Sequence, residues 1–196
     1  MIAFKKWTGM FNGRSSESYQ TVQVRAPRDY FNRADAFIED VKYMTEEELT
    51  GLNKAFLAKL LFDNFLESVR QGKDLYEYLS SLSRLYGSVL TTPNNIGKKV
   101  SDSSAPTKFH WSLTTKNGKK EESEFLTLSI RLHSKEVNRV NVFFEDLRWK
   151  HHPLDIELDE LVSLLFIEFI TALRNGLTEE TSQEIMDFIL SKWEER

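Results

Sequence analysis

The chain has 196 residues, of which 40% are hydrophobic and 12% aromatic, and it carries a formal net charge of −4 at pH 7. This length and composition predict a single globular domain whose core is large enough to fold without cross-links. The absence of cysteine excludes disulfides, thiolate metal sites and a cysteine nucleophile. The acidic balance argues against a general nucleic-acid binder, because phosphate contacts require a basic surface.

The charges are unevenly distributed along the chain. Residues 1–33 contain six basic and two acidic residues, whereas residues 155–196 contain three basic and eleven acidic residues. The basic and acidic regions could attract each other within the fold, or they could bind two different partners.

No export or membrane-spanning segment is predicted. The first residues are charged, but no continuous apolar stretch follows them, so they do not form a signal peptide. The longest apolar run, 161–173, is interrupted by polar residues and is shorter than the roughly 20 residues that a membrane span needs. We therefore expect a soluble, cytoplasmic protein. Phe4, Trp7 and Phe11 recur at helical spacing beside two lysines, which suits an in-plane membrane anchor, docking onto the protein's own core, or disorder.

The first structured elements predicted are a short edge strand and a helix. Residues 19–25 alternate between apolar and polar, as a half-buried strand does. Apolar residues then recur at helical spacing over 29–42, with Asp29 as a possible N-cap.

A longer helix is predicted over residues 46–71. Thr45 and Glu48 form a Thr-x-x-Glu capping box just ahead of its apolar-periodic run. Gly72 is expected to end it, because glycine is favoured directly after the last helical turn.

A further helix, predicted at 74–86, ends at the glycine that opens the least structured part of the sequence. Residues 87–106 are expected to form a mobile functional lid, a boundary between two halves, or poorly ordered padding. Within this loop, Gly97-Lys98-Lys99 suggests phosphate binding. The second glycine and the Ser or Thr of a P-loop are missing, so a solvated loop is predicted instead.

The second half predicts a three-stranded antiparallel β-meander at about 107–115, 121–133 and 138–149. Asn117-Gly118 lies between the first two strands and is a type I′ hairpin signal. The register centred on that turn collects apolar residues on one face, which a slip of one residue would scramble. That buried face is predicted to contain Phe109, Trp111, Leu126, Leu128, Ile130, Val142 and Phe144.

Two helices follow the meander, at 155–175 and 178–194. The first has an apolar surface broken only by a narrow polar sector, so it is predicted to be the most buried helix and to lie across the meander. Gly176 should end it, and Thr178 should cap the last helix. The fold class is therefore α+β, with these two helices on one sheet face and the pair at 46–86 on the other face or at an end.

The four histidines do not predict a metal site. In the predicted register His110 faces Phe125, which lies eight residues from His133 along the neighbouring strand, so the two histidines are more than about 20 Å apart. His151 and His152 are adjacent, and no third ligand is suitably spaced. We expect ordinary imidazoles, with no metal and no cofactor.

Glu168 is the one carboxylate within the most apolar stretch of the chain. A raised pKa there would suit a general acid, although a solvated stripe beside Thr171 and Asn175 is the simpler interpretation. Serine-nucleophile elbows, dinucleotide fingerprints and the His-Glu-x-x-His motif are missing from the sequence. An enzyme is therefore not favoured.

The polar face of the predicted sheet carries aromatic and basic residues. Phe125, Arg131 and Phe143 together resemble a base-stacking platform. Lysines are scarce there, so we expect the N-terminal helices to cover this face. Together with Lys98 and Lys99, these three are the candidate interaction residues.

The leading functional hypothesis is a non-enzymatic protein-interaction module, such as a small bacterial or phage accessory, regulatory or immunity-type protein. Its acidic C-terminal surface would suit a basic protein partner, or the chain would self-associate. One alternative is a nucleic-acid-associated protein that uses the basic N-terminal segment with Lys98, Lys99 and Lys108. A second is a small-ligand binder or enzyme with 87–106 as a lid over His110 or His151.

Overall fold

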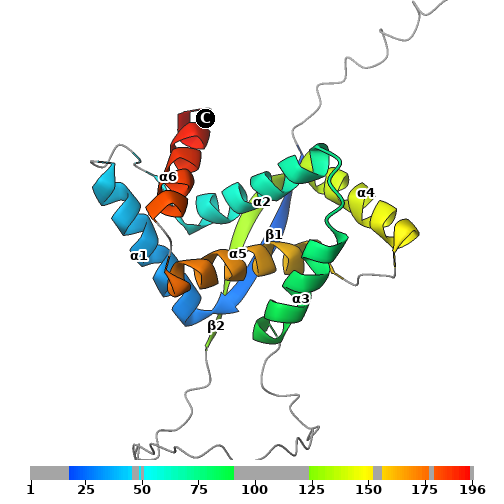
Figure 1. The fold of residues 1–196 in the computed structure, drawn as a ribbon, viewed down its shortest axis with the longest axis horizontal. Coiled ribbons are helices and arrows are strands. Elements are labelled where there is room, and N and C mark those ends of the chain that lie inside the picture. The colour runs from blue at the N-terminus through cyan, green and yellow to red at the C-terminus, as the bar shows by residue number, and fades with distance from the viewer. Residues whose placement is uncertain are drawn as a thin grey trace, which may run out of the picture.

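The computed structural model describes residues 18–45, 49, 51–90, 124–151, 156–176 and 179–194. These residues form an α+β fold in which a two-stranded antiparallel sheet is packed with helices (Figure 1). In chain order the elements are β1 (Tyr19–Pro27), α1 (Arg28–Met44), α2 (Lys54–Arg70), α3 (Tyr76–Leu90), β2 (Phe125–His133), α4 (Ser134–Lys150), α5 (Leu158–Asn175) and α6 (Glu179–Glu194).

The sheet pairs the start of the chain with its second half. Val22 lies opposite Ile130 and Val24 opposite Leu128. The side chains of Val22, Val24 and Ile130 are buried, whereas their neighbours along each strand are mostly exposed, because successive side chains of a strand point to opposite faces. The strand predicted at 19–25 is confirmed, as is the second half of the strand predicted at 121–133.

Helix α5 lies across the strands and forms the centre of the fold (Figure 1). It buries eight residues, more than any other helix of the described chain, which confirms the prediction for 155–175. Its Phe166 is fully buried and packs against Phe31 of α1, with ring centroids 5.1 Å apart. At the surface of the same helix, Phe169 meets Phe37 edge to face at 5.4 Å.

One serine joins α5 to the outer edge of β1. The Ser163 hydroxyl accepts a hydrogen bond from the backbone N–H of Arg25 at 2.9 Å and donates one to the carbonyl of Asp159 at 2.6 Å. Ser163 is only 2% exposed and is the one buried polar side chain of the described residues. It therefore supplies a partner to an edge group that would otherwise be left without one.

The third strand predicted at 138–149 is wrong, because this segment belongs to helix α4. The His133 side chain accepts a hydrogen bond from the backbone N–H of Lys135, and the Glu136 carboxylate accepts one from the backbone N–H of His133. This capping box starts the helix directly at the end of β2.

The apolar residues of this segment follow the helical period. Phe144 is buried as predicted, in one stripe with Val137, Val140 and Leu147. Val142, which the strand register placed beside them, is 50% exposed. The apolar residues of this segment fit the two-residue period of a strand as well as the helical period. The capping box favours the helix, because it provides hydrogen-bond partners for the first helical turn. The first predicted strand, 107–115, with its turn and its Phe109 and Trp111, lies outside the described residues.

Two helix boundaries differ from prediction by four residues or more. Helix α2 begins at Lys54, where the Asn53 side chain caps the backbone N–H of Phe56 at 2.9 Å. Thr45 instead ends α1, and its hydroxyl donates to the carbonyl of Val41. Helix α3 continues through Gly87 to Leu90, since one glycine lowers helix propensity by only about 1 kcal/mol and does not force a stop.

Two other glycines end their helices as predicted. Gly72 follows α2 with a φ of 71°, and Gly176 follows α5 with a φ of 85°. Positive φ is a conformation that glycine adopts without steric cost.

The sequence predicted helices on both faces of the sheet, but the described helices cover only one face. Helix α5 contacts β1 and α2 contacts β2, and both lie on the apolar face of the strands, while the polar residues of the opposite face are mostly exposed. The pair at 46–86 was expected on the other face or at an end, and the first of these two placements is wrong for α2, which lies on the same face as α5.

Candidate functional site

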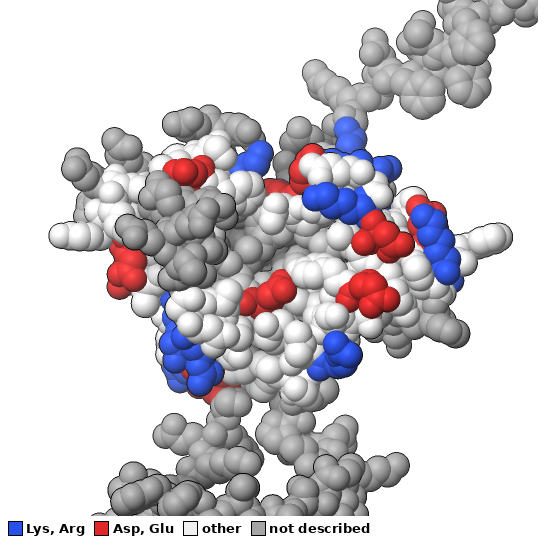
Figure 2. Space-filling view, in the orientation of Figure 1, with Lys and Arg blue, Asp and Glu red and all other residues white. Residues whose placement is uncertain are grey.

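Helices α2, α3 and α5 frame a groove of about 610 Å³. In the orientation of Figure 1 these helices face the viewer, and Figure 2 shows that the middle of this face is largely uncharged. The walls are mostly apolar and come from all three helices and the turn before α3. They are formed by Leu61, Phe65, Leu75, Leu165, Phe169 and Ala172, with Asn64, Ser68, Lys73, Tyr78 and Glu168 as the polar members.

A tyrosine and a glutamate meet within this groove. The Tyr78 hydroxyl donates a hydrogen bond to the Glu168 carboxylate at 2.5 Å. Partial burial among apolar side chains raises the pKa of Glu168, and the hydrogen bond from Tyr78 partly offsets that rise. The pKa of Tyr78 is raised mainly by burial and also by the carboxylate to which it is hydrogen-bonded. Its hydroxyl therefore stays a proton donor at neutral pH. Glu168 is therefore a half-buried, singly hydrogen-bonded acceptor rather than part of a solvated stripe.

The lining of the groove is mostly apolar, with a few polar side chains among the walls. Among its described lining residues there is one carboxylate and no histidine. Apolar walls with a small number of placed polar groups are the usual composition of a binding site.

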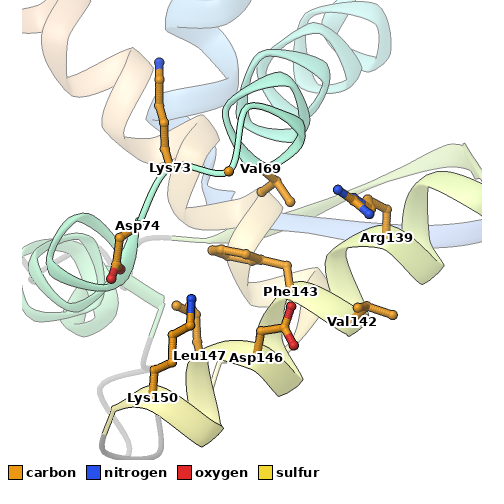
Figure 3. Close-up of a pocket in the computed structure, with 10 residues that line it drawn as sticks. Val69, Lys73, Asp74, Arg139, Val142, Phe143, Asp146, Leu147 and Lys150 are labelled. Atoms are coloured by element: carbon orange, nitrogen blue, oxygen red, sulfur yellow. The ribbon is translucent and has the colours of Figure 1, made fainter.

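A smaller notch of about 180 Å³ lies between the α2–α3 turn and α4 (Figure 3). Its floor is apolar and includes Val69, Phe143 and Leu147. Its rim is charged, with Arg139 and Lys150 at opposite sides and Asp146 between them on the same helix.

The end of the notch is closed by an aromatic and ionic contact. The rings of Tyr76 and His151 stack with centroids 4.2 Å apart, and Nε2 of His151 lies 3.1 Å from the carboxylate of Asp74. The backbone N–H of Tyr76, followed by His151, lowers the pKa of Asp74. This contact joins the end of α4 to the start of α3, which gives His151 a structural role.

Helix α4 also exposes large apolar side chains. Trp149 is 94% exposed and Val142 is 50% exposed. A tryptophan so exposed is uncommon in a folded domain, and aromatic residues of this kind are enriched at protein interfaces.

The polar face of the β1–β2 sheet is open, contrary to expectation. Arg25, Thr127 and Ser129 are exposed there. The Arg131 guanidinium lies 5.1 Å from the centre of the Tyr19 ring. This face is therefore polar and basic.

Of the three residues predicted to share a platform, Phe125 and Arg131 lie on the same face of β2, whereas Phe143 lies on another element. Phe125 is half-buried at the start of β2 and Arg131 is on the open sheet face. Phe143 belongs to α4, where its ring packs against Phe65 at 6.0 Å. Lys98 and Lys99 lie outside the described residues.

Two prominent surface residues were missed at the sequence level. Trp149 was placed at the end of a strand, although residues three and seven positions apart along 139–149 could have indicated an exposed helical stripe. Tyr78 belongs to no motif of the sequence, and no pattern links it to Glu168, from which it is separated by 90 positions.

Within the described chain, no three His, Asp or Glu side chains gather as metal ligands, and no helix has the length and apolarity to cross a membrane. His110 and His152 lie outside that part of the chain, as does the predicted lid beyond residue 90. Comparisons with protein-family models, curated proteins and solved structures found no match for this chain.

Proposed function

We propose that the protein is a non-enzymatic interaction module whose α2–α3–α5 groove receives an amphipathic helix from a basic partner protein. The observation that carries this proposal is the composition of the groove, which combines apolar walls from α2, α5 and the turn before α3 with the single, half-buried carboxylate of Glu168.

The length of the groove suits a helix. Its lining runs from Leu61 to Ser68 on α2 and from Leu165 to Ala172 on α5. Each stretch corresponds to about 10 Å, or roughly two helical turns. Two turns accommodate the i, i+3 or i+4, and i+7 anchors by which amphipathic helices dock into apolar grooves.

The carboxylate of Glu168 in the groove favours a partner helix that carries a lysine or an arginine. Burial disfavours the ionised form of Glu168, and a lysine or arginine brought beside it would favour that form again. The acidic surplus of residues 155–196 would also attract a basic partner over longer distances. The affinity should therefore decrease as the pH falls through the pKa of Glu168, because the carboxylate is then protonated.

A display library of twelve-residue peptides, selected on the full chain, tests this function. We expect selected peptides to combine apolar residues at helical spacing with a central Lys or Arg. Ala172→Arg should abolish their binding by filling the groove, and Glu168→Gln should weaken it about tenfold, because one charged partner is lost.

Leu85→Ser is the matched control, since Leu85 is exposed on α3 but does not line the groove. Binding of the selected peptides should be unchanged in this variant. Selection of no peptide, selection of acidic peptides, or binding that survives Ala172→Arg would each overturn the proposal.

A second candidate is nucleic-acid association through the open sheet face, which the exposed Arg25 and Arg131 favour. Fluorescence anisotropy with single-stranded oligonucleotides at low salt should then show binding that the double variant Arg25→Glu and Arg131→Glu removes. The double variant Arg84→Glu and Arg148→Glu, on α3 and α4, is the control, because it changes the net charge equally at exposed positions away from the sheet. Absence of binding to the unmodified chain, or equal loss in the control, would count against this candidate.

A further inference from the structure

Helix α4 is attached to the fold by a narrow stripe of its surface. Four of its seventeen residues are buried, namely Val137, Val140, Phe144 and Leu147. The rest of its circumference is largely exposed, and it carries the most exposed large apolar side chain of the described residues, Trp149.

The exposed side of α4 has an ordered sequence of charge and apolarity. Arg139, Val142, Asp146 and Trp149 follow one another at spacings of three, four and three residues, which places them on one helical face. Along this face a cation, an apolar residue, an anion and an aromatic residue alternate. No ion pair within the described structure involves Arg139 or Asp146, and they stand about 10 Å apart along the helix.

If a second copy of this helix runs antiparallel to the first, the cation of each helix face lies opposite the anion of the other. We propose that the exposed face of α4 is a self-association surface, on which two copies of the chain pair their α4 helices antiparallel about a two-fold axis. In a two-fold contact, if residue i meets residue j, then j also meets i. Arg139 of each copy then faces Asp146 of the other, so two ion pairs form at once. A parallel arrangement would place like charges together instead.

The remaining side chains of the face fit the same arrangement. With Arg139 paired to Asp146, the two-fold axis passes close to Val142, which lines the notch above Phe143. Each Val142 then covers the apolar floor of the notch of the second copy. Trp149 reaches the first turn of the opposite α4, where the exposed Lys135 can stack on its ring.

This surface is separate from the groove of the proposed function, because none of Arg139, Val142, Asp146 or Trp149 lines that groove. Self-association and peptide binding can therefore be tested independently, in the same preparations.

Sedimentation velocity of the full chain over a wide range of concentrations tests the proposal. The unmodified chain should pass from monomer to dimer. Arg139→Asp and Asp146→Arg should each weaken the dimer about tenfold or more, since each places like charges opposite one another. The double variant, which exchanges the two charges, should regain the dimer. Trp149→Ala should weaken it without changing the charge.

Arg148→Asp is the matched control, because Arg148 is exposed on the same helix but lies outside the face. It should leave the dimer unchanged. Circular dichroism should confirm that all variants remain folded, as expected for exposed positions. A chain that stays monomeric throughout, a double variant no better than the single variants, or a control as damaging as Arg139→Asp would overturn the proposal.

Discussion

Helices α4 and α5 have nearly the same length, 17 and 18 residues, but opposite relations to the rest of the molecule. Helix α5 buries eight residues around most of its circumference, whereas α4 buries four in one narrow stripe. The first contacts the strands and other helices on several sides and holds the fold together. The second leaves a mixed charged and apolar surface outside. The difference teaches that one helix supplies the stability, while its neighbour is free to carry a recognition surface.

The largest expected effect comes from removing a central ring of α5. Phe166→Ala should lower the free energy of unfolding by about 3–5 kcal/mol, because it deletes a fully buried side chain packed on Phe31. Trp149→Ala on α4 should change it by less than about 0.5 kcal/mol, since that ring is exposed. Urea unfolding of both variants measures the contrast. Equal losses would remove the distinction between the two helices.

A smaller effect is expected from the serine that joins α5 to β1. Ser163→Ala leaves the part-buried backbone N–H of Arg25 without its side-chain partner, which should lower the free energy of unfolding by about 1 kcal/mol. Thr171→Ala is the matched control, because the Thr171 hydroxyl bonds only to the carbonyl of Ile167 within the same helix. The control should lose less, and amide hydrogen exchange at Arg25 should accelerate in the serine variant alone. Unchanged exchange at Arg25 would contradict this role.

The smallest effect concerns the carboxylate of α5. Because burial raises the pKa of Glu168 in the folded state, the folded chain gains stability as the pH falls from that raised pKa towards the ordinary value for Glu. Glu168→Gln lacks this gain, and at neutral pH it should be slightly more stable than the unmodified chain, by less than about 1 kcal/mol. The difference should shrink on acidification. Thermal unfolding between about pH 4 and pH 8 checks this, with the exposed Asp146→Asn as control. A Gln variant that is less stable at neutral pH would give the wrong sign.

The sequence predicted α5 well because its composition leaves few choices. A helix that is apolar around most of its circumference would expose a large apolar surface to water if it lay at the surface. Such a helix is therefore expected to form the core. The same argument fails for 138–149, where Val140, Val142 and Phe144 alternate like a strand while Val140 and Phe144 also fit a helix. The capping box of His133 and Glu136 favours the helix over the strand. In the sequence this box is visible only as a histidine three residues before a glutamate.

The candidate groove was beyond the reach of sequence patterns. Glu168 stood out as a charge in an apolar helix, and the direction of its pKa could be expected from that position alone. Its partner Tyr78 comes from another helix, 90 positions away, and the walls come from three elements whose packing no local periodicity determines. The open sheet face was missed for the same reason, since strand alternation indicates two faces but not which helices cover them.

The pairing of β1 with β2 also determines when the fold can form. Tyr19 lies opposite His133 and Pro27 opposite Phe125, so the two strands are separated by about 100 residues of chain. At a synthesis rate of about 5–20 residues per second, β1 leaves the ribosome about 5–20 seconds before its partner strand exists. During that interval its apolar Val22 and Val24 and its unpaired edge are open to other chains. Contacts this distant in sequence also slow folding, because a long loop must close before they form. A newly made chain is therefore most exposed to aggregation before residue 133 emerges, and α5, which follows, closes the edge of β1 last.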